Sequence, residues 1–282
     1  MPNVLRELRS LTGVAANSTV TAKLPVKNRR YDFIALRISD GALALTDSDL
    51  ASRVKDIRLI ADGVKLIDVS ATFLLRLSAF YGLRKFSHMI LIPLARYEFN
   101  TTEEARAFGI GTQNLGNLTL EIDLGAFTNS PSVEVYYWAA PSQEPLGRHI
   151  RMKRTVYGSA ISTGDLQIND YLDTLRPQGR EVGLVGMHFN SRFFDEFSLK
   201  TDGQELIGHR VLNAYEQMVL VETDRMASRY FDSAWAQFDF ALGSVTNILN
   251  LTGVGLLEME FAAHTAVPGG ISIFSETMHS TL

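Results

Sequence analysis

The chain has 282 residues, of which 46% are hydrophobic, so it can form two domains or one large domain with substantial cores. It contains no cysteine, which excludes a disulfide framework and thiolate chemistry and is compatible with assembly in a reducing cytoplasm. No apolar run approaches the roughly 20 residues that span a bilayer, and the N-terminus lacks the apolar core of a secretory signal, so we do not expect export by that route.

The net charge of −4 is unevenly distributed along the chain. Within residues 1–30 the only acidic side chain is Glu7, and the basic ones are Arg6, Arg9, Lys23, Lys27, Arg29 and Arg30. A basic segment on an acidic body indicates an anionic partner for that segment. The body lacks a domain-wide basic surface, so we do not expect direct binding of nucleic acid.

Short elements with β patterning predominate in the first half. The helical spacing of Val4, Leu5, Leu8 and Leu11 predicts a short helix that ends at Gly13. Strands are predicted over 18–24 and 31–38, then a loop over 39–53 and a hairpin over 54–69 that turns at Asp62-Gly63. Ser70 is expected to cap a helix that closes at Gly82. A strand over 86–94, a short helix over 103–108 capped by Thr102, and strands over 118–124 and 132–139 complete this half.

The second half follows the same plan after a linker predicted over 141–147. The expected elements are a strand over 148–157, a loop over 172–180, a strand over 182–189, a hairpin at Asp202-Gly203, a helix over 211–219, and strands near 237–242, 256–261 and 271–274.

Two pairs of segments indicate that the halves are repeats. Residues 57–67 match residues 197–207 at an offset of 140, and residues 120–124 match 257–261 at an offset of 137. The alternative is coincidence, because Asp-Gly hairpins recur in β proteins. Each half has about eight short strands and a helix after its central hairpin, which suits a jelly roll. We therefore predict an all-β fold of two tandem eight-stranded jelly rolls with short helices in loops, divided into an arm over 1–17 and domains over 18–147 and 148–282.

Motifs of known catalytic chemistry are absent from the sequence. There is no nucleotide-binding glycine loop, no HExxH and no GxSxG. The histidines are too scattered for a zinc site, so we interpret them as surface or packing residues: His88, His149, His188, His209, His264 and His279.

Three pairs of carboxylates remain as candidates for chemistry: Glu103/Glu104, Glu121/Asp123 and Glu258/Glu260. A glycosidase needs two carboxyl groups facing each other in a cleft. The last two pairs instead lie on the outward faces of equivalent strands, so we predict no enzyme and no required cofactor. Glu121, Asp123, Glu258 and Glu260 could hold Ca²⁺ between subunits, or could form salt bridges or a solvated face.

Three segments resemble the major coat protein of corticoviruses, which are tailless icosahedral phages with an internal membrane: 30–36 (RYDFIAL), 57–63 (IRLIADG) and 111–122 (GTQNLGNLTLEI). The resemblance implies a major capsid protein whose homotrimers form pseudo-hexagonal capsomers of a virion shell, assembled in the host cytoplasm. The partners it implies are neighbouring capsomers, minor capsid or membrane proteins and the internal lipid membrane. Ca²⁺ is associated with this family, but no ligand residue carries over.

The membrane prediction centres on the N-terminal segment. In a helix, Leu5, Leu8 and Leu11 would form an apolar stripe flanked by Arg6 and Arg9, which can lie at an anionic lipid interface. The alternative is that the segment clamps a neighbouring capsomer. Two other functions stay open at this point: a tandem β-sandwich hydrolase acting on glycans, and a virion spike that binds glycans.

Overall fold

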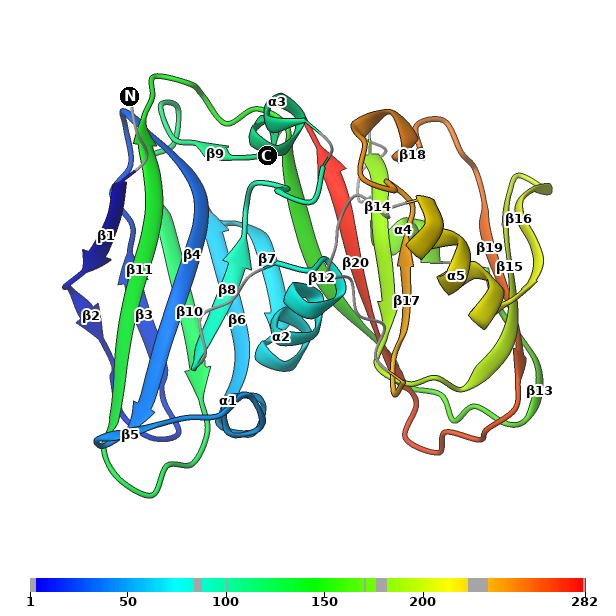
Figure 1. The fold of residues 1–282 in the computed structure, drawn as a ribbon, viewed down its shortest axis with the longest axis horizontal. Coiled ribbons are helices and arrows are strands. Elements are labelled where there is room, and N and C mark those ends of the chain that lie inside the picture. Colours follow the sequence, from blue (N-terminus) through cyan, green and yellow to red (C-terminus); the bar gives the residue numbers. More distant parts are fainter. Residues whose placement is uncertain are drawn as a thin grey trace. The chain divides into compact units, whose positions relative to one another are not determined.

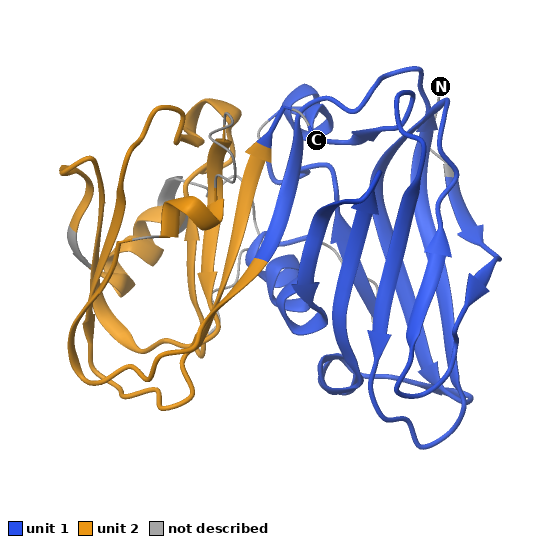
Figure 2. Cartoon of the chain, turned by 180° about the vertical axis from the view of Figure 1, so that it is seen from behind, with its two compact units in different colours: residues 1–153, 279–282 blue, residues 154–278 orange. Residues whose placement is uncertain are grey.

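The structure is a computed structural model that describes residues 4–83, 88–99, 101–169, 171–175, 182–222, 233–280 and 282. It divides into two compact units, of which unit 1 comprises residues 1–153 and 279–282 and unit 2 comprises residues 154–278 (Figure 2). Residues 148–153 and 279–282 thus fall in the first unit, although we predicted them in the second domain. No helix in the described ranges has the length and apolar character needed to cross a membrane.

Unit 1 is built on two sheets (Figure 1). The six-stranded sheet has the order β1-β11-β4-β5, with β8 and β9 also paired to β4. Its strands are β1 Val4–Leu8, β4 Arg29–Asp40, β5 Leu43–Ala44, β8 Met89–Pro93, β9 Ile110–Gly111 and β11 Pro131–Pro141. The other sheet of the unit has the order β12-β7-β6-β10-β3-β2. Its strands are β2 Leu11–Thr12, β3 Thr19–Lys23, β6 Val54–Ala61, β7 Val64–Ser70, β10 Leu118–Leu124 and β12 His149–Tyr157.

The core of unit 1 follows from the alternation of side chains along these strands. Ile34, Leu36 and Ile38 of β4 are fully buried, whereas Phe33 and Arg37 keep part of their surface exposed. The helices of the unit are α1 Asp47–Arg53, α2 Ala71–Phe80 and α3 Thr102–Ala107. The side chain of Ser70 accepts a hydrogen bond from the Phe73 amide at 3.2 Å, which confirms the predicted cap of α2.

Unit 2 also contains two groups of strands. In one the order is β13-β19-β15-β16, and in the other β17-β14-β20, with β18 paired to β14. The strands are β13 Gly164–Ile168, β14 Val182–Phe189, β15 Phe194–Thr201, β16 Gln204–Val211, β17 Ala236–Asp239, β18 Leu249–Asn250, β19 Leu257–Ala263 and β20 Ile271–His279. The helices are α4 Tyr171–Leu175, α5 Leu212–Glu222 and the 3-10 turn η2 Val245–Asn247.

Aromatic rings dominate the core of unit 2. Phe194 lies 4.7 Å from Phe261 and 4.8 Å from Phe193, measured between ring centroids. Tyr215 of α5 joins this cluster at 5.1 Å from Phe238. The helix predicted over 211–219 begins at Leu212, and its Leu212, Tyr215 and Val219 are buried. Val211, which ends β16, and Met218 were expected on the same apolar face but are exposed.

The two Asp-Gly turns occupy equivalent places in their units, which confirms the repeat. Asp62 and Asp202 have φ angles of 46° and 48°, and the glycines that follow have φ angles of 84° and 76°. Two consecutive residues with positive φ make the turn that suits a tight β-hairpin. The carboxylate of Asp62 accepts hydrogen bonds from the amides of Gly116 and Asn117 at 3.0 and 2.7 Å. That of Asp202 accepts from Gly255 and Leu256 at 2.9 and 2.8 Å.

The register of the repeat differs from the prediction at the second pair of segments. Leu118 lies opposite Ala61 at the end of one hairpin, and Leu257 lies opposite Thr201 at the end of the other. Leu118 therefore corresponds to Leu257, an offset of 139, and the predicted offset of 137 is wrong. Consequently Glu121 corresponds to Glu260 and not to Glu258.

Several local predictions need correction. Residues 4–8 form strand β1, so the helix predicted over 4–11 is wrong. Helix α1 and strand β5 lie within the loop predicted over 39–53, and α4 begins the loop predicted over 172–180. The cap of α3 is Thr101 and not Thr102. The first residues of the strand predicted over 86–94 and the last of the loop predicted over 172–180 lie outside the described residues.

Candidate assembly and ion sites

The carboxylate pair of unit 1 is held by one arginine of the neighbouring strand. Arg58 of β6 donates to Glu121 at 2.9 Å and forms two hydrogen bonds to Asp123 at 2.7 and 2.8 Å. Thr19 donates a further hydrogen bond to Asp123 at 2.6 Å. These bonds, above all those from Arg58, hold the pKa of Asp123 below its usual range, while the bond to Asp123 raises the pKa of Arg58. Glu121 and Asp123 thus form a salt-bridge cluster.

Of the pair predicted in unit 2, Glu260 is also bound by a cation, but this cation comes from a different strand position. Lys200 of β15 lies 2.9 Å from Glu260, and Ser198 donates to the same carboxylate at 2.9 Å. Hydrogen bonding to Glu260 raises the pKa of Lys200. Ser198 corresponds to Arg58 of unit 1 and carries no charge. The positive charge comes instead from Lys200, two residues further along β15. Glu258 lies opposite Lys200 in the pairing of β15 with β19.

These four carboxylates do not fit a calcium ion within either unit. Ca²⁺ takes six to eight oxygen ligands, whereas Glu121, Asp123 and Glu260 already face an arginine or a lysine. Across the described ranges, no group of three or more histidine, aspartate or glutamate side chains is arranged to hold a metal ion. Calcium therefore stays a prediction from the resemblance, without support from the donor set in either unit.

Three of the described histidines are enclosed by the fold: His149, His188 and His279. The His188 Nε2 atom lies 2.8 Å from the Glu276 carboxylate, and both side chains are fully buried. Gly186 makes this pair possible, because a Cβ atom there would lie 2.7 Å from the Glu276 carboxylate. Burial lowers the pKa of His149 to about 4, so this imidazole is neutral at neutral pH. All three histidines pack in the interior, while the side chain of His209 lies outside the described residues.

The N-terminal segment is part of both sheets of unit 1. Strand β1 pairs antiparallel with β11, and β2 pairs with β3 of the other sheet. Leu8 is buried, Leu11 is half-buried, and Leu5 is 50% exposed, so the three leucines do not form one apolar stripe. Arg6 and Arg9 are exposed. Membrane contact by this segment stays a prediction, but the amphipathic helix on which it rested is not formed.

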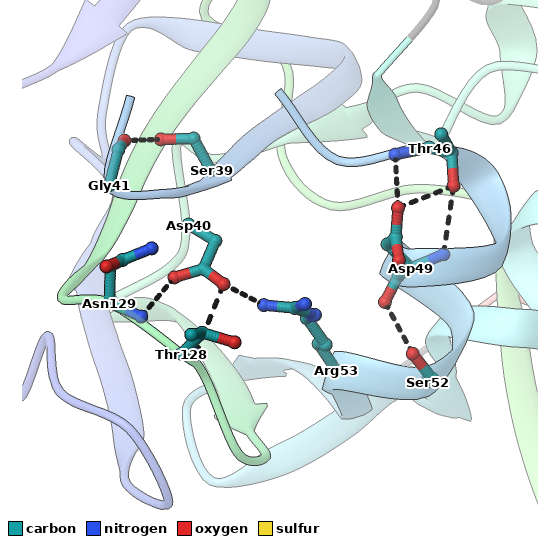
Figure 3. Close-up of polar contacts among 9 residues, drawn as sticks. All are labelled: Ser39, Asp40, Gly41, Thr46, Asp49, Ser52, Arg53, Thr128 and Asn129. Carbon is teal, nitrogen blue, oxygen red and sulfur yellow. Dashed lines mark hydrogen bonds and ion pairs between the residues drawn. The ribbon is translucent and has the colours of Figure 1, made fainter. Parts of the chain in front are cut away.

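A polar clamp that the sequence patterns did not predict joins the end of β4 to one loop and to helix α1 in unit 1 (Figure 3). Asp40, the buried last residue of β4, accepts hydrogen bonds from the amides of Thr128 and Asn129 and from the guanidinium of Arg53 in α1. Burial opposes ionisation, but the bonds from Asn129 and Arg53 prevail and lower the pKa of Asp40. Helix α1 is itself fixed at Thr46, whose hydroxyl accepts from the Asp49 amide at 3.2 Å.

The sequence indicates only part of this clamp. The dipeptide Asp40-Gly41 marks a turn after the strand predicted over 31–38. The partners of Asp40 lie 13 and 89 residues away along the chain, and no local pattern links them.

We expect the bonds of Asp40 to make the stability of the folded chain depend on pH. Because the pKa of Asp40 is lower in the folded chain, the carboxylate stabilises folding above the ordinary aspartate pKa of about 3.9. This stabilisation is lost as the pH falls through the lowered pKa. Asp40→Asn should therefore melt at a lower temperature than the wild type at pH 7, and the two melting temperatures should converge below pH 4. Thermal unfolding between pH 2.5 and 8 measures this.

The matched control for this prediction is Asp165→Asn. Asp165 is exposed on β13 and makes none of the contacts that hold Asp40. Its replacement should leave the melting curve close to that of the wild type at every pH. A difference between Asp40→Asn and the wild type that stays constant from pH 8 to pH 2.5 would contradict the assignment.

Comparison with known proteins identifies the fold of the chain and a family that its first half resembles. The profile of the family described as viral coat protein P2, N-terminal domain, matches residues 5–140. No curated protein sequence matches the chain.

Solved structures resemble the chain over both units. The major capsid protein P2 of bacteriophage PM2 has a TM-score of 0.83 at 18% sequence identity, covering 99% of this chain and 98% of that one. The major capsid protein of STIV has a TM-score of 0.67 at 16% identity, covering 99% and 97%. The Faustovirus major capsid protein has a TM-score of 0.63 at 7% identity, covering 98% and 89%. The predicted double jelly roll is confirmed, and these relatives are capsid proteins, which does not support the hydrolase or the glycan-binding spike.

Proposed function

We propose that this chain is a viral coat protein that forms homotrimers, and that these trimers are the capsomers of an icosahedral shell around an internal membrane. The observation that carries the proposal is the similarity of the whole chain to double jelly-roll capsid proteins, with a TM-score of 0.83 over 99% of its length. A trimer of subunits with two similar barrels places six barrels around one axis. Threefold symmetry then gives a nearly hexagonal outline, through contacts that close a ring.

The internal membrane is proposed from the resemblance to corticoviruses and from the positive charge of the N-terminal segment. Arg6 and Arg9 are exposed in a segment that is basic overall, within a chain of net charge −4. Each basic side chain near an anionic surface contributes about 1 kcal/mol to attachment, so one subunit would bind weakly. Many trimers in one shell would add these contributions. Minor capsid or membrane proteins would be further partners, and no direct contact with nucleic acid is proposed.

The proposal includes no catalytic activity and no required cofactor. Glu121, Asp123 and Glu260 are bound to basic side chains that neutralise them. A glycosidase needs one carboxylate and one carboxylic acid that both reach the substrate. The bonds from Arg58 lower the pKa of Asp123, which makes this carboxylate unsuitable as the acid.

The experiment that tests the proposal is sedimentation velocity of the purified protein, together with electron cryomicroscopy of particles that contain it. We expect a single species with the mass of three chains, and in the particle a threefold capsomer with six barrels above a lipid bilayer. A monomer at micromolar concentration, or capsomers that contain another number of chains, would disprove the trimer. A shell with no bilayer beneath it would disprove the membrane part alone.

A further inference from the structure

The outward side of the six-stranded sheet in unit 1 carries an unusual row of large side chains. Strands β1, β11 and β4 are neighbours in this sheet (Figure 1). In their pairing, Leu5 lies opposite Trp138, and Trp138 lies opposite Phe33. The rings of Phe33 and Trp138 are stacked with centroids 5.6 Å apart. Because side chains alternate along a strand, these three residues point away from the core that Ile34 and Leu36 fill.

Two further rows of side chains run across β11, β4 and β8. In one row Tyr136 lies opposite Ala35, and Ala35 lies opposite Leu91. In the other row Glu134 lies opposite Arg37, and Arg37 lies opposite Met89. We call this surface, from Leu5 and Trp138 to Leu91 and Met89, the outer face. It keeps part of its apolar area open, since Leu5 is 50% exposed and Phe33, Trp138, Leu91 and Met89 are half-buried.

The composition of the outer face is that of a protein–protein interface. Tryptophan, tyrosine, phenylalanine, methionine and arginine are enriched in the centres of such interfaces, and lysine is depleted. Arg37 and Glu134 pair with each other at 3.3 Å, and the Tyr136 hydroxyl donates to Glu134 at 2.6 Å. Arg37, Glu134 and Tyr136 are therefore satisfied among themselves, and the apolar rows can be covered without leaving Arg37 or Glu134 unpaired. Glu7 of β1 is the exposed charge at the edge of the outer face.

Charge indicates which partner can cover the outer face. It carries Glu7, Glu134 and Arg37, a small excess of negative charge, so an anionic lipid surface or a nucleic acid would be repelled. A protein partner remains, and a coat protein is surrounded by copies of itself at high local concentration. Large, aromatic and largely uncharged surfaces are typical of permanent contacts between subunits.

We propose that the outer face is the surface through which one subunit contacts a second copy of this chain within the trimer. The inference rests on the proposed trimer and adds the surface that forms it. In a ring of three, the outer face of each subunit meets a different surface of the next subunit. Trp138 and Phe33 lie at the centre of this contact, where a buried aromatic side chain contributes most to affinity.

The test is the dissociation of trimers that carry charges on the outer face. Leu5→Glu combined with Met89→Glu places two carboxylates on its rim without removing the Phe33–Trp138 stack. Sedimentation velocity over a dilution series should show at least a tenfold higher concentration for half-dissociation than for the wild type, with an unchanged far-ultraviolet circular dichroism spectrum. The control is Leu43→Glu. Leu43 is 66% exposed on β5 opposite Asp40, off the outer face, and its replacement should leave the trimer intact.

A second measurement on the wild type does not depend on the folding of a variant. Hydroxyl-radical footprinting above and below the dissociation concentration should show Met89, Tyr136 and Trp138 protected in the trimer, while Tyr97, which is 44% exposed, keeps its reactivity. Equal reactivity of the three side chains in both states, or a double variant that dissociates like the wild type, would overturn the inference and leave the trimer itself standing. A wild type that is monomeric would overturn the trimer and this inference together.

Discussion

Replacing Phe194 by alanine is expected to lower the free energy of unfolding by about 3–5 kcal/mol. Phe194 is fully buried in β15, and five phenylalanine rings surround it with centroids between 4.7 and 6.3 Å away: Phe189, Phe193, Phe197, Phe238 and Phe261. Removing the ring leaves a cavity that this crowded cluster can fill only in part, so contacts are lost as well as burial.

Urea unfolding followed by tryptophan fluorescence measures this loss. The chain has two tryptophans, Trp138 in unit 1 and Trp235 in unit 2, so in a Trp138→Phe background the fluorescence reports on unit 2. Phe194→Leu should cost less than Phe194→Ala, because most of the volume is kept. Leu206→Ala is the control, since Leu206 is 40% exposed and its loss should cost under about 1 kcal/mol. If Phe194→Ala lowers the free energy of unfolding by less than about 1 kcal/mol, the Phe194 ring is not central to the stability of this core.

The second large effect is expected at a buried arginine of unit 1. Arg96 is 1% exposed, its guanidinium lies 4.5 Å from the ring centroid of Tyr81, and its Nε atom donates to Glu98, which is also buried. Arg96→Met should lower the free energy of unfolding by about 3–5 kcal/mol, because the Glu98 carboxylate then loses its charged partner inside the protein. The stacking on Tyr81 is lost as well.

Two further variants separate the cost of the buried charge from that of the packing. Arg96→Met combined with Glu98→Met removes both charges and should recover part of the stability that Arg96→Met loses. Arg37→Met breaks an ion pair whose side chains are 53% and 35% exposed, and should cost less than about 1 kcal/mol. Equal losses for Arg96→Met and Arg37→Met in urea unfolding would show that burial of the Arg96 pair has no special cost.

Local chemistry explains which elements could be predicted. The side chain of Ser70 caps α2, and Gly82 follows the helix with a φ of 62°, so both ends of this helix could be predicted from the sequence. The Asp62-Gly63 and Asp202-Gly203 turns need positive φ at both residues, which few residue types accept. In these cases the residues that decide the structure are neighbours along the chain.

The N-terminal segment shows why a local pattern can mislead. The spacing of Leu5, Leu8 and Leu11 suits a helix, but a short isolated helix is barely stable in water. Strand β11 presents backbone N–H and C=O groups to β1. Pairing with them gives hydrogen-bond partners to the backbone groups of β1 from Val4 to Leu8. The hydrogen bonds of the sheet therefore outweigh the helical spacing.

The all-β class, the two hairpins with their Asp-Gly turns, the helices that follow them and the repetition of the unit could all be predicted from the sequence. Each of these depends on residues close together or on alternation along one strand. Strand pairing in the folded chain was needed to show that Glu121 corresponds to Glu260, that Arg58 neutralises Glu121 and Asp123, that Asp40 joins a loop to helix α1, and that Leu5, Trp138 and Phe33 share one face. The physical reason is that strand register and cross-strand pairing join residues distant along the chain, and a shift of two residues leaves the alternation unchanged while it replaces every partner.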